Sequence, residues 1–212
     1  MKNTVIIVIL LVLLTSPIAS YAAEKENNVL DYALLIGDSF TAKLEGQGLE
    51  EEYHLNIVAY PGITSKELRD NLQAYKDVQQ PSKVIILCGI NDLILSDKET
   101  VSVDGEAELL KNIQERFNVP VYVQLLFPVT ELLTIAKPNL TNEKITEYNK
   151  QLTELCYQNG YFVIDTRDNF IREDGYLQYT EDGLHIEDQD RYIKNIMKAV
   201  SEQEKEIKRL IN

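Results

Sequence analysis

The chain has 212 residues, of which 44% are hydrophobic and 26% are charged. This composition is typical of one globular domain and excludes a disordered chain. Acidic residues number 34 against 21 basic ones, which gives a net charge of −13. Nucleic acids and anionic membrane surfaces bind positive patches, so neither is expected as a partner. The simplest interpretation of the charge is solubility.

The first 22 residues have the layout of a secretory signal peptide. Lys2 precedes an apolar run over residues 5–14, and small residues follow up to Ala22. The run is short for a membrane span. We expect cleavage after Ala22 and a secreted or extracytoplasmic surface protein whose residues 23–212 form a single domain. The alternative is an uncleaved anchor, and only then is the membrane a partner.

Five short apolar runs predict β-strands. They cover residues 32–36, 55–59, 84–88, 121–126 and 161–164. Helical patterns separate them, starting near residues 64, 104, 141 and 188, and Thr64 with Glu67 forms a capping box at the first of these. Strands that alternate with helices indicate βαβ units, so we expect a parallel sheet with helices on both faces.

Two connections between these elements are long. Residues 93–103 are expected to form a loop. Residues 127–140 contain an apolar patch at Leu132, Leu133 and Ile135. Loops of this length are often functional, and a short helix packed on the body is an equally good interpretation.

Four short motifs fall where the sheet's carboxyl edge is expected. They are Gly37-Asp38-Ser39, Gly62, Gly89-Ile90-Asn91-Asp92 and Asp182-Gly183-Leu184-His185. Open α/β sheets bind ligands at this edge, so the motifs should lie close together. Each is weak alone, because Gly-Asp-Ser is also common in turns and serine is a common helix N-cap.

The residue types in these motifs suit nucleophilic catalysis. The Ser39 hydroxyl needs a base to accept its proton, and histidine oriented by a carboxylate is the usual base. Of the two histidines, His54 has no carboxylate in a suggestive place, whereas Asp182 precedes His185 by three residues. Backbone N–H groups of Ser39 and Gly62 and the Asn91 side-chain amide could form an oxyanion hole.

With these motifs the chain resembles the SGNH, or GDSL, hydrolase family over essentially all of the expected mature chain. The resemblance implies a flavodoxin-like three-layer αβα sandwich with a five-stranded parallel sheet. It also implies that Ser39 is the nucleophile, that His185 is the base oriented by Asp182, and that Ser39, Gly62 and Asn91 form the oxyanion hole. Phe40 replaces the leucine of Gly-Asp-Ser-Leu, and this change is expected to touch no catalytic atom.

Other residues admit two interpretations. Ile94, Leu95 and Phe127 could line a substrate pocket, or they could serve ordinary packing. Asp38 is expected to hold the turn around Ser39. Cys88 and Cys156 lie in apolar contexts typical of buried free thiols rather than of a disulfide. The sequence has no zinc motif, and we expect no cofactor.

The favoured function is a secreted serine esterase that acts on a short acyl ester, such as an acetyl ester, of a carbohydrate. A lysophospholipase or thioesterase is the alternative within the same chemistry. A metal-dependent phosphoesterase that gathers Asp38, Asp92, Asp165 and Asp182, and a non-catalytic surface binding module, are further alternatives. Acyl transfer in place of hydrolysis and the oligomeric state stay open.

Overall fold

The computed structural model describes residues 28–71, 78–96 and 99–211. The predicted signal segment, residues 1–22, therefore lies outside the described residues. Among the residues that are described, no helix is both long enough and apolar enough to cross a membrane.

The strands form one five-stranded parallel sheet in the order β2-β1-β3-β4-β5. The strands are β1 (Ala33–Gly37), β2 (Asn56–Ala59), β3 (Lys83–Leu87), β4 (Val121–Gln124) and β5 (Phe162–Ile164). This order is that of flavodoxin-like sheets, as the family resemblance implied. All residues of β1 are buried, and so are four of the five residues of β3. Apart from Lys83 at the start of β3, both strands are continuous apolar runs, because helices cover the two faces of a parallel sheet.

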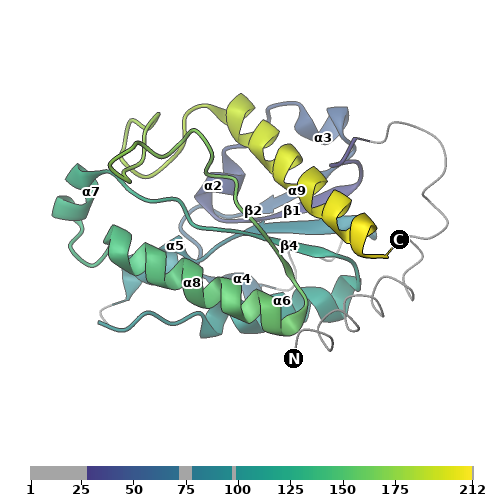
Figure 1. Ribbon diagram of the computed structural model, residues 1–212, viewed down its shortest axis with the longest axis horizontal. Coiled ribbons are helices and arrows are strands. Elements are labelled where there is room, and N and C mark those ends of the chain that lie inside the picture. Colours follow the sequence, from purple (N-terminus) through teal and green to yellow (C-terminus); the bar gives the residue numbers. More distant parts are fainter. Residues whose placement is uncertain (1–27, 72–77, 97–98, 212) are drawn as a thin grey trace.

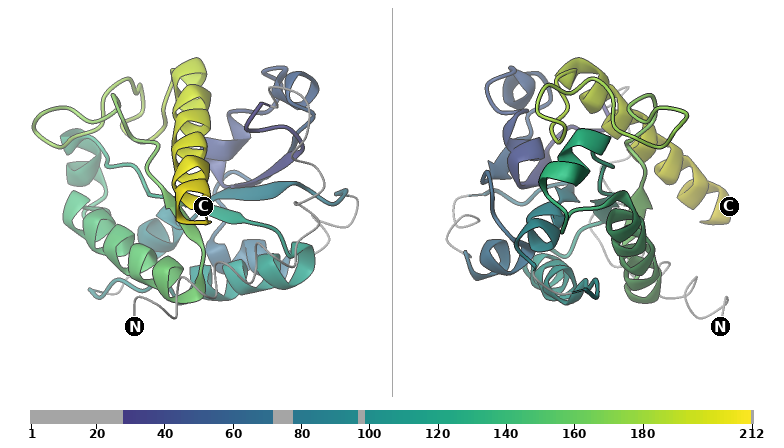
Figure 2. Two further views of the ribbon diagram at one scale, coloured as in Figure 1. Left: turned by 45° about the vertical axis from the view of Figure 1, so that its right-hand side comes forward. Right: turned by 90° about the vertical axis from the view of Figure 1, so that its left-hand side faces the viewer.

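Helices form the outer two layers (Figures 1 and 2). Helices α2 (Ser39–Ala42), α3 (Leu49–Glu52) and α9 (Gln189–Ile211) lie on one face of the sheet. The opposite face is covered by α4 (Ser65–Asp70), α5 (Ile90–Leu95), α6 (Asp104–Phe117) and α8 (Asn142–Asn159). The capping box at α4 is confirmed, with Thr64 and Glu67 each bonded to the other's backbone.

The structure corrects the expected loop at residues 93–103 and decides between the two interpretations of residues 127–140. The predicted loop at residues 93–103 begins inside α5, a helix of only six residues, too short to show a helical period in the sequence. The helix expected to start near residue 104 is α6, which begins at Asp104 with Val103 at its N-cap position. The connection over residues 127–140 contains a short helix, α7 (Glu131–Ala136), none of whose residues is buried.

Both cysteines are buried and free, as predicted. Cys88 directly follows β3, and Cys156 lies on the inner face of α8. Each is 1% exposed or less and belongs to the main hydrophobic core. The thiols therefore contribute to packing, and burial raises the pKa of Cys88 well above its usual value.

Candidate active site

Ser39 is the first residue of α2 and lies directly beyond the carboxyl end of β1. Asp38, at the N-cap of α2, accepts a hydrogen bond from the Phe40 backbone N–H at 3.1 Å. The expected structural role of Asp38 in this turn is thus confirmed. Because Ser39 is the first residue of the helix, its own N–H has no partner within α2.

His185 lies between Ser39 and Asp182. Its Nε2 is 2.7 Å from the Ser39 Oγ, and its Nδ1 is 2.5 Å from Asp182 Oδ2. The other Asp182 oxygen accepts the backbone N–H groups of Leu184 and His185 at 2.9 and 2.8 Å. The turn that contains Gly183 therefore folds the carboxylate back onto the imidazole. The three side chains form one continuous hydrogen-bond chain across 146 residues of sequence.

The carboxylates on the two sides of Ser39 differ in protonation. Partial burial would raise the pKa of Asp182, but hydrogen bonds from the His185 side chain and from the backbone of His185 and Leu184 lower it overall. Burial raises the pKa of Asp38 to about 7, against a lowering hydrogen bond from the Phe40 backbone. Asp182 is therefore ionised at neutral pH, whereas Asp38 is protonated in a large share of molecules.

Phe40 contacts the imidazole, contrary to the expectation that the residue after Ser39 touches no catalytic atom. Its ring centroid is 5.2 Å from that of His185, and it stacks on Phe127 at 5.5 Å. The first turn of α2 directs position 40 into the core, which brings the ring beneath the histidine. Phe127 is 1% exposed and also packs edge-on against Tyr192. The structure thus places Phe127 in the aromatic core beneath His185.

The two further oxyanion candidates lie beyond β2 and β3. Gly62 has a φ of +80°, and a Cβ added to it would have no neighbour within 4 Å. Gly89 has a φ of +116° and a Cβ there would collide with Tyr148, so a side chain is excluded at the turn that leads to Asn91. Asn91 is 9% exposed, and its amide donates one hydrogen bond to the Ile63 carbonyl at 3.0 Å. The Asn91 side chain is thereby tied to the residue that follows Gly62.

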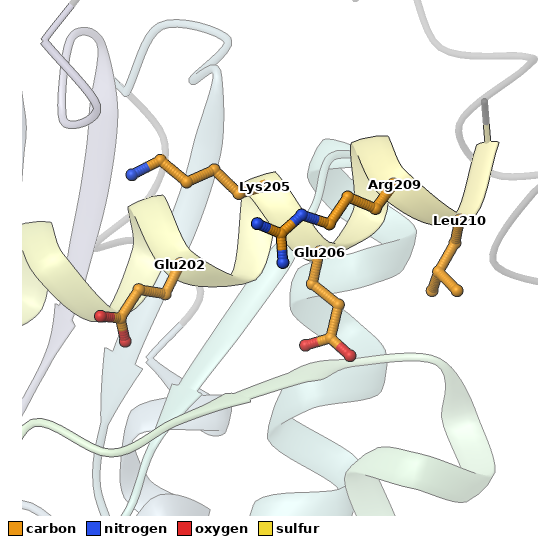
Figure 3. Close-up of a pocket in the computed structure, with 5 residues that line it drawn as sticks. All are labelled: Glu202, Lys205, Glu206, Arg209 and Leu210. Carbon is orange, nitrogen blue, oxygen red and sulfur yellow. The ribbon is translucent and has the colours of Figure 1, made fainter.

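The remaining pocket candidates lie on α5, immediately after Asn91. Ile94 is half-buried against the core, whereas Leu95 is 69% exposed. A separate hollow on α9 is lined by Glu202, Lys205, Glu206, Arg209 and Leu210 (Figure 3). The neighbouring Glu204 pairs with Lys83, the first residue of β3. The hollow is therefore at the opposite edge of the sheet from Ser39.

The loop that carries Asp182 and His185 is supported by two segments that the sequence did not link to it. The Thr130 N–H donates to the Gly183 carbonyl at 3.0 Å, which fastens the start of α7 to this loop. Lys43, just after α2, forms an ion pair with Glu187 at 2.7 Å. The long connection over residues 127–140 thus buttresses the site through its backbone.

Sequence reasoning also missed Ser65 and Glu106, which lie behind the oxyanion candidates. Ser65 donates to Asp92 and contacts Glu106, and both Ser65 and Glu106 are buried. A signal for Glu106 was present in the sequence. It lies on the same helical stripe as Leu110, Ile113 and Phe117, so the helical period places its carboxyl group among core residues.

The four carboxylates of the metal hypothesis have separate partners. Asp38 bonds to Phe40, Asp92 to Ser65, Asp165 to Arg167 and Asp182 to His185. Over residues 28–71, 78–96 and 99–211, no group of three or more acidic, histidine or cysteine side chains is arranged to hold a metal ion. The cluster of carboxylates that a metal-dependent phosphoesterase needs is therefore not found among these described residues.

Comparisons with known proteins agree with this arrangement. Residues 35–189 match the model of the GDSL-like Lipase/Acylhydrolase family. A structure from Streptococcus pneumonia, provisionally named a platelet activating factor, has a TM-score of 0.67 at 22% sequence identity. The alignment covers 80% of this chain and 84% of that one. A GDSL-like lipase from Bacteroides thetaiotaomicron has a TM-score of 0.63 at 15% sequence identity, and the alignment covers 90% of this chain and 93% of the lipase. These two likenesses show the fold.

Curated relatives also match in sequence. An N-acylneuraminate cytidylyltransferase from Streptococcus agalactiae is 28% identical over 156 residues, which are 72% of this chain and 34% of the relative. The chain thus spans about a third of the length of the curated relatives it matches. Because the family model covers most of the chain, and because the sheet order is that of the family, the chain belongs to the GDSL-like lipase/acylhydrolase family of hydrolases that act on ester bonds.

Proposed function

We propose that this protein is a secreted serine esterase that uses Ser39, His185 and Asp182 as a catalytic triad. The observation that carries the proposal is the continuous chain of hydrogen bonds from the Ser39 Oγ through the imidazole to Asp182. His185 Nε2 accepts the hydroxyl proton while Oγ attacks the ester carbonyl carbon. Ionised Asp182 keeps the second ring proton on Nδ1 and stabilises the imidazolium that forms.

The attack leaves a negative charge on the former carbonyl oxygen. The backbone N–H groups of Ser39 and Gly62 and the second amide proton of Asn91 are the proposed donors to this oxyanion. As the intermediate collapses, the alcohol leaves with the proton from His185. Water, deprotonated by the same imidazole, then attacks the acyl-enzyme and releases the acid and free Ser39.

For the substrate, we favour a short acyl ester, such as an acetyl ester, on a carbohydrate. Phe40 and Phe127 are 4% and 1% exposed and fill the space beneath the imidazole with stacked rings, which disfavours a long acyl chain there. The curated relatives are named for N-acylneuraminate, a sugar acid. An acidic protein that is exported would meet such glycan esters outside the cell, and the signal segment over residues 1–22 is the basis for proposing export.

One observation favours the alternative of a lysophospholipase or thioesterase. Leu132 and Ile135 on α7 are 78% and 72% exposed, and Thr130, the N-cap residue of α7, bonds to the Gly183 carbonyl. Apolar side chains so close to the catalytic loop could contact a long acyl chain that runs over the surface.

Hydrolysis of acetyl, butyryl and palmitoyl nitrophenyl esters separates these substrates. We expect the acetyl ester to be cleaved with the highest kcat/KM, and a preference for palmitoyl would overturn the carbohydrate assignment.

Ser39→Ala should lower kcat by roughly 10⁴-fold or more and should abolish labelling by a fluorophosphonate. Unchanged hydrolysis by Ser39→Ala would refute the mechanism.

A further inference from the structure

A buried hydrogen-bond chain joins the two segments that carry the proposed oxyanion donors. Ser65 begins α4, three residues after Gly62, and Asp92 follows Asn91 in α5. Asp92 Oδ2 accepts the backbone N–H of Ser65 at 2.9 Å and lies 3.0 Å from its hydroxyl oxygen. On its other side, the Ser65 hydroxyl oxygen lies 2.8 Å from Glu106 Oε2, a side chain from α6.

The proton count of this chain requires one neutral carboxyl group. The Ser65 hydroxyl contacts two carboxyl oxygens but has only one proton to donate. The second contact is a hydrogen bond only if that carboxyl donates to Ser65. Asp92 Oδ2 already accepts the Ser65 backbone N–H, so Glu106 is the better donor. The chain then runs from the Glu106 O–H to the Ser65 oxygen, and from the Ser65 O–H to Asp92.

The surroundings of Glu106 favour this neutral form. Glu106 is 1% exposed, and burial raises its pKa to about 8, although hydrogen bonds from Ser65 and Tyr148 oppose the rise. Burial also raises the pKa of the less buried Asp92, but hydrogen bonds from the backbone and side chain of Ser65 oppose it. An ionised Glu106 would place a second negative charge beside Asp92 in the interior.

We propose that protonated Glu106 is a positioning residue for the oxyanion hole, which holds the Gly62 segment against Asn91 through Ser65 and Asp92. The bond from the Asn91 amide to the Ile63 carbonyl is the second link between the same segments. Loss of the Glu106 proton would leave two carboxylates competing for one hydroxyl proton. The segments would then separate and the donors would lose their alignment. The proposal rests on the proposed esterase mechanism.

Several titratable groups face Glu106 from the elements packed around it. They are Asp38 after β1, Cys88 after β3, Asp92 on α5, and Tyr148 and Cys156 on α8. Burial raises the pKa of each of them. The pKa of Asp38, about 7, is close to that of Glu106, about 8. Any test by pH must therefore separate these two carboxyl groups.

The test uses Glu106→Ala and Glu106→Gln, with Glu115→Gln on the exposed side of the same helix as the matched control. With nitrophenyl acetate, we expect Glu106→Ala to lower kcat by about 10- to 100-fold and to change KM by less than about 3-fold, because the oxyanion forms only during reaction. Glu106→Gln should recover kcat to within about 5-fold, because its amide N–H can donate to the Ser65 oxygen. Glu115→Gln should match the wild type.

The pH profile distinguishes positioning from a merely structural role. Wild-type kcat should decline as the pH passes about 8, where Glu106 loses its proton. Glu106→Gln has no such proton to lose, so the decline in kcat should be absent from this variant. Asp38→Asn should still show the decline. A decline that persists in Glu106→Gln and disappears in Asp38→Asn would assign the titration to Asp38 and overturn the proposal. If Glu106→Ala does not fold, the profile of Glu106→Gln still decides.

Labelling by a fluorophosphonate separates this proposal from the esterase mechanism. A wild-type protein that is neither labelled nor active would refute the proposed function itself. A wild-type protein that is labelled and active, together with a Glu106→Ala variant of equal kcat, would refute only the positioning role.

Discussion

The fold treats the exposed Asp182 and the buried Asp38 and Glu106 in opposite ways. On the loop side, the Asp182 side chain is 51% exposed, and hydrogen bonds lower its pKa despite partial burial. On the core side, Asp38 and Glu106 are 0% and 1% exposed, and burial raises the pKa of each. The carboxyl group is thus favoured in its charged form on the loop side and in its neutral form on the core side. Burial and hydrogen bonding, and not the residue type, decide the protonation state of each carboxyl group.

The two sides also differ in what supports them. Asp182 lies on an exposed turn of its loop, which is held by the bond from Thr130 to Gly183 and the ion pair of Lys43 with Glu187, among other contacts. Glu106, in contrast, lies between Ser65 and the hydrophobic core. Substitutions on the loop side should therefore affect activity more than stability, and substitutions on the core side should affect both.

Among the substitutions that test this comparison, the largest effect is expected from Asp182→Asn. An amide at this position can orient the imidazole but cannot stabilise its charge, and it favours the wrong ring tautomer. We expect kcat for nitrophenyl acetate to fall by about 10³- to 10⁴-fold. Because Asp182 lies on an exposed turn, the midpoint of thermal unfolding should change little. Steady-state kinetics and a thermal melt measure the two effects.

Asp174→Asn is the matched control for this prediction, because Asp174 also lies on an exposed turn and pairs with Arg172. It should leave kcat unchanged. If Asp182→Asn retained more than about a tenth of the wild-type kcat, Asp182 would not be the residue that orients and stabilises His185.

On the core side, Glu106 should make the free energy of unfolding depend on pH. The folded pKa of Glu106, about 8, lies above its ordinary value of 4.5. Between these two values the folded state binds the proton and the unfolded state does not. The stability that this group contributes is therefore complete below about pH 4.5 and is lost as the pH rises through 8. The loss should amount to a few kcal/mol.

Glu106→Gln removes this titration. Relative to the wild type, the free energy of unfolding of this variant should improve steadily from about pH 5 to about pH 8 and then level off, as measured by urea denaturation. Asp38 also has a raised pKa, but it is present in both proteins. Its own contribution to the pH dependence of stability is therefore common to the two and drops out of their difference. A constant difference between the two proteins across this range would show that Glu106 has no raised pKa in the folded state.

Sequence patterns predicted most of the fold because its strands are unusually clear. All five strands fall within two residues of the predicted runs, and the ends of α6 and α8 occur at Asn118 and Gly160 in left-handed conformations. The short helices α3 and α5 were not predicted, because four to six residues do not show a helical period. Helix α7 was one of two equal interpretations of residues 127–140. The positions of these short helices follow from tertiary packing.

The site was predictable where its residues lie in short local motifs. Asp182 and His185 are three residues apart, and the turn between them follows from that spacing. Ser65, Glu106 and Thr130 were missed, because their partners lie 27, 41 and 53 residues away in sequence and become neighbours only in the folded sheet. The contact of Phe40 with His185 likewise depends on the orientation of α2.

The smallest effect should come from Thr130→Ala, which tests how firmly α7 must hold the catalytic loop. The Thr130 side chain accepts the Leu133 N–H and caps α7, and its backbone N–H donates to Gly183. Loss of an N-cap costs about 1 kcal/mol, so the start of α7 should loosen and kcat should fall by about 2- to 5-fold. Thr141→Ala removes the same kind of cap from α8 and should cost similar stability without lowering kcat. Equal kcat values for the two variants would mean that the loop holds His185 against Ser39 without the support of α7.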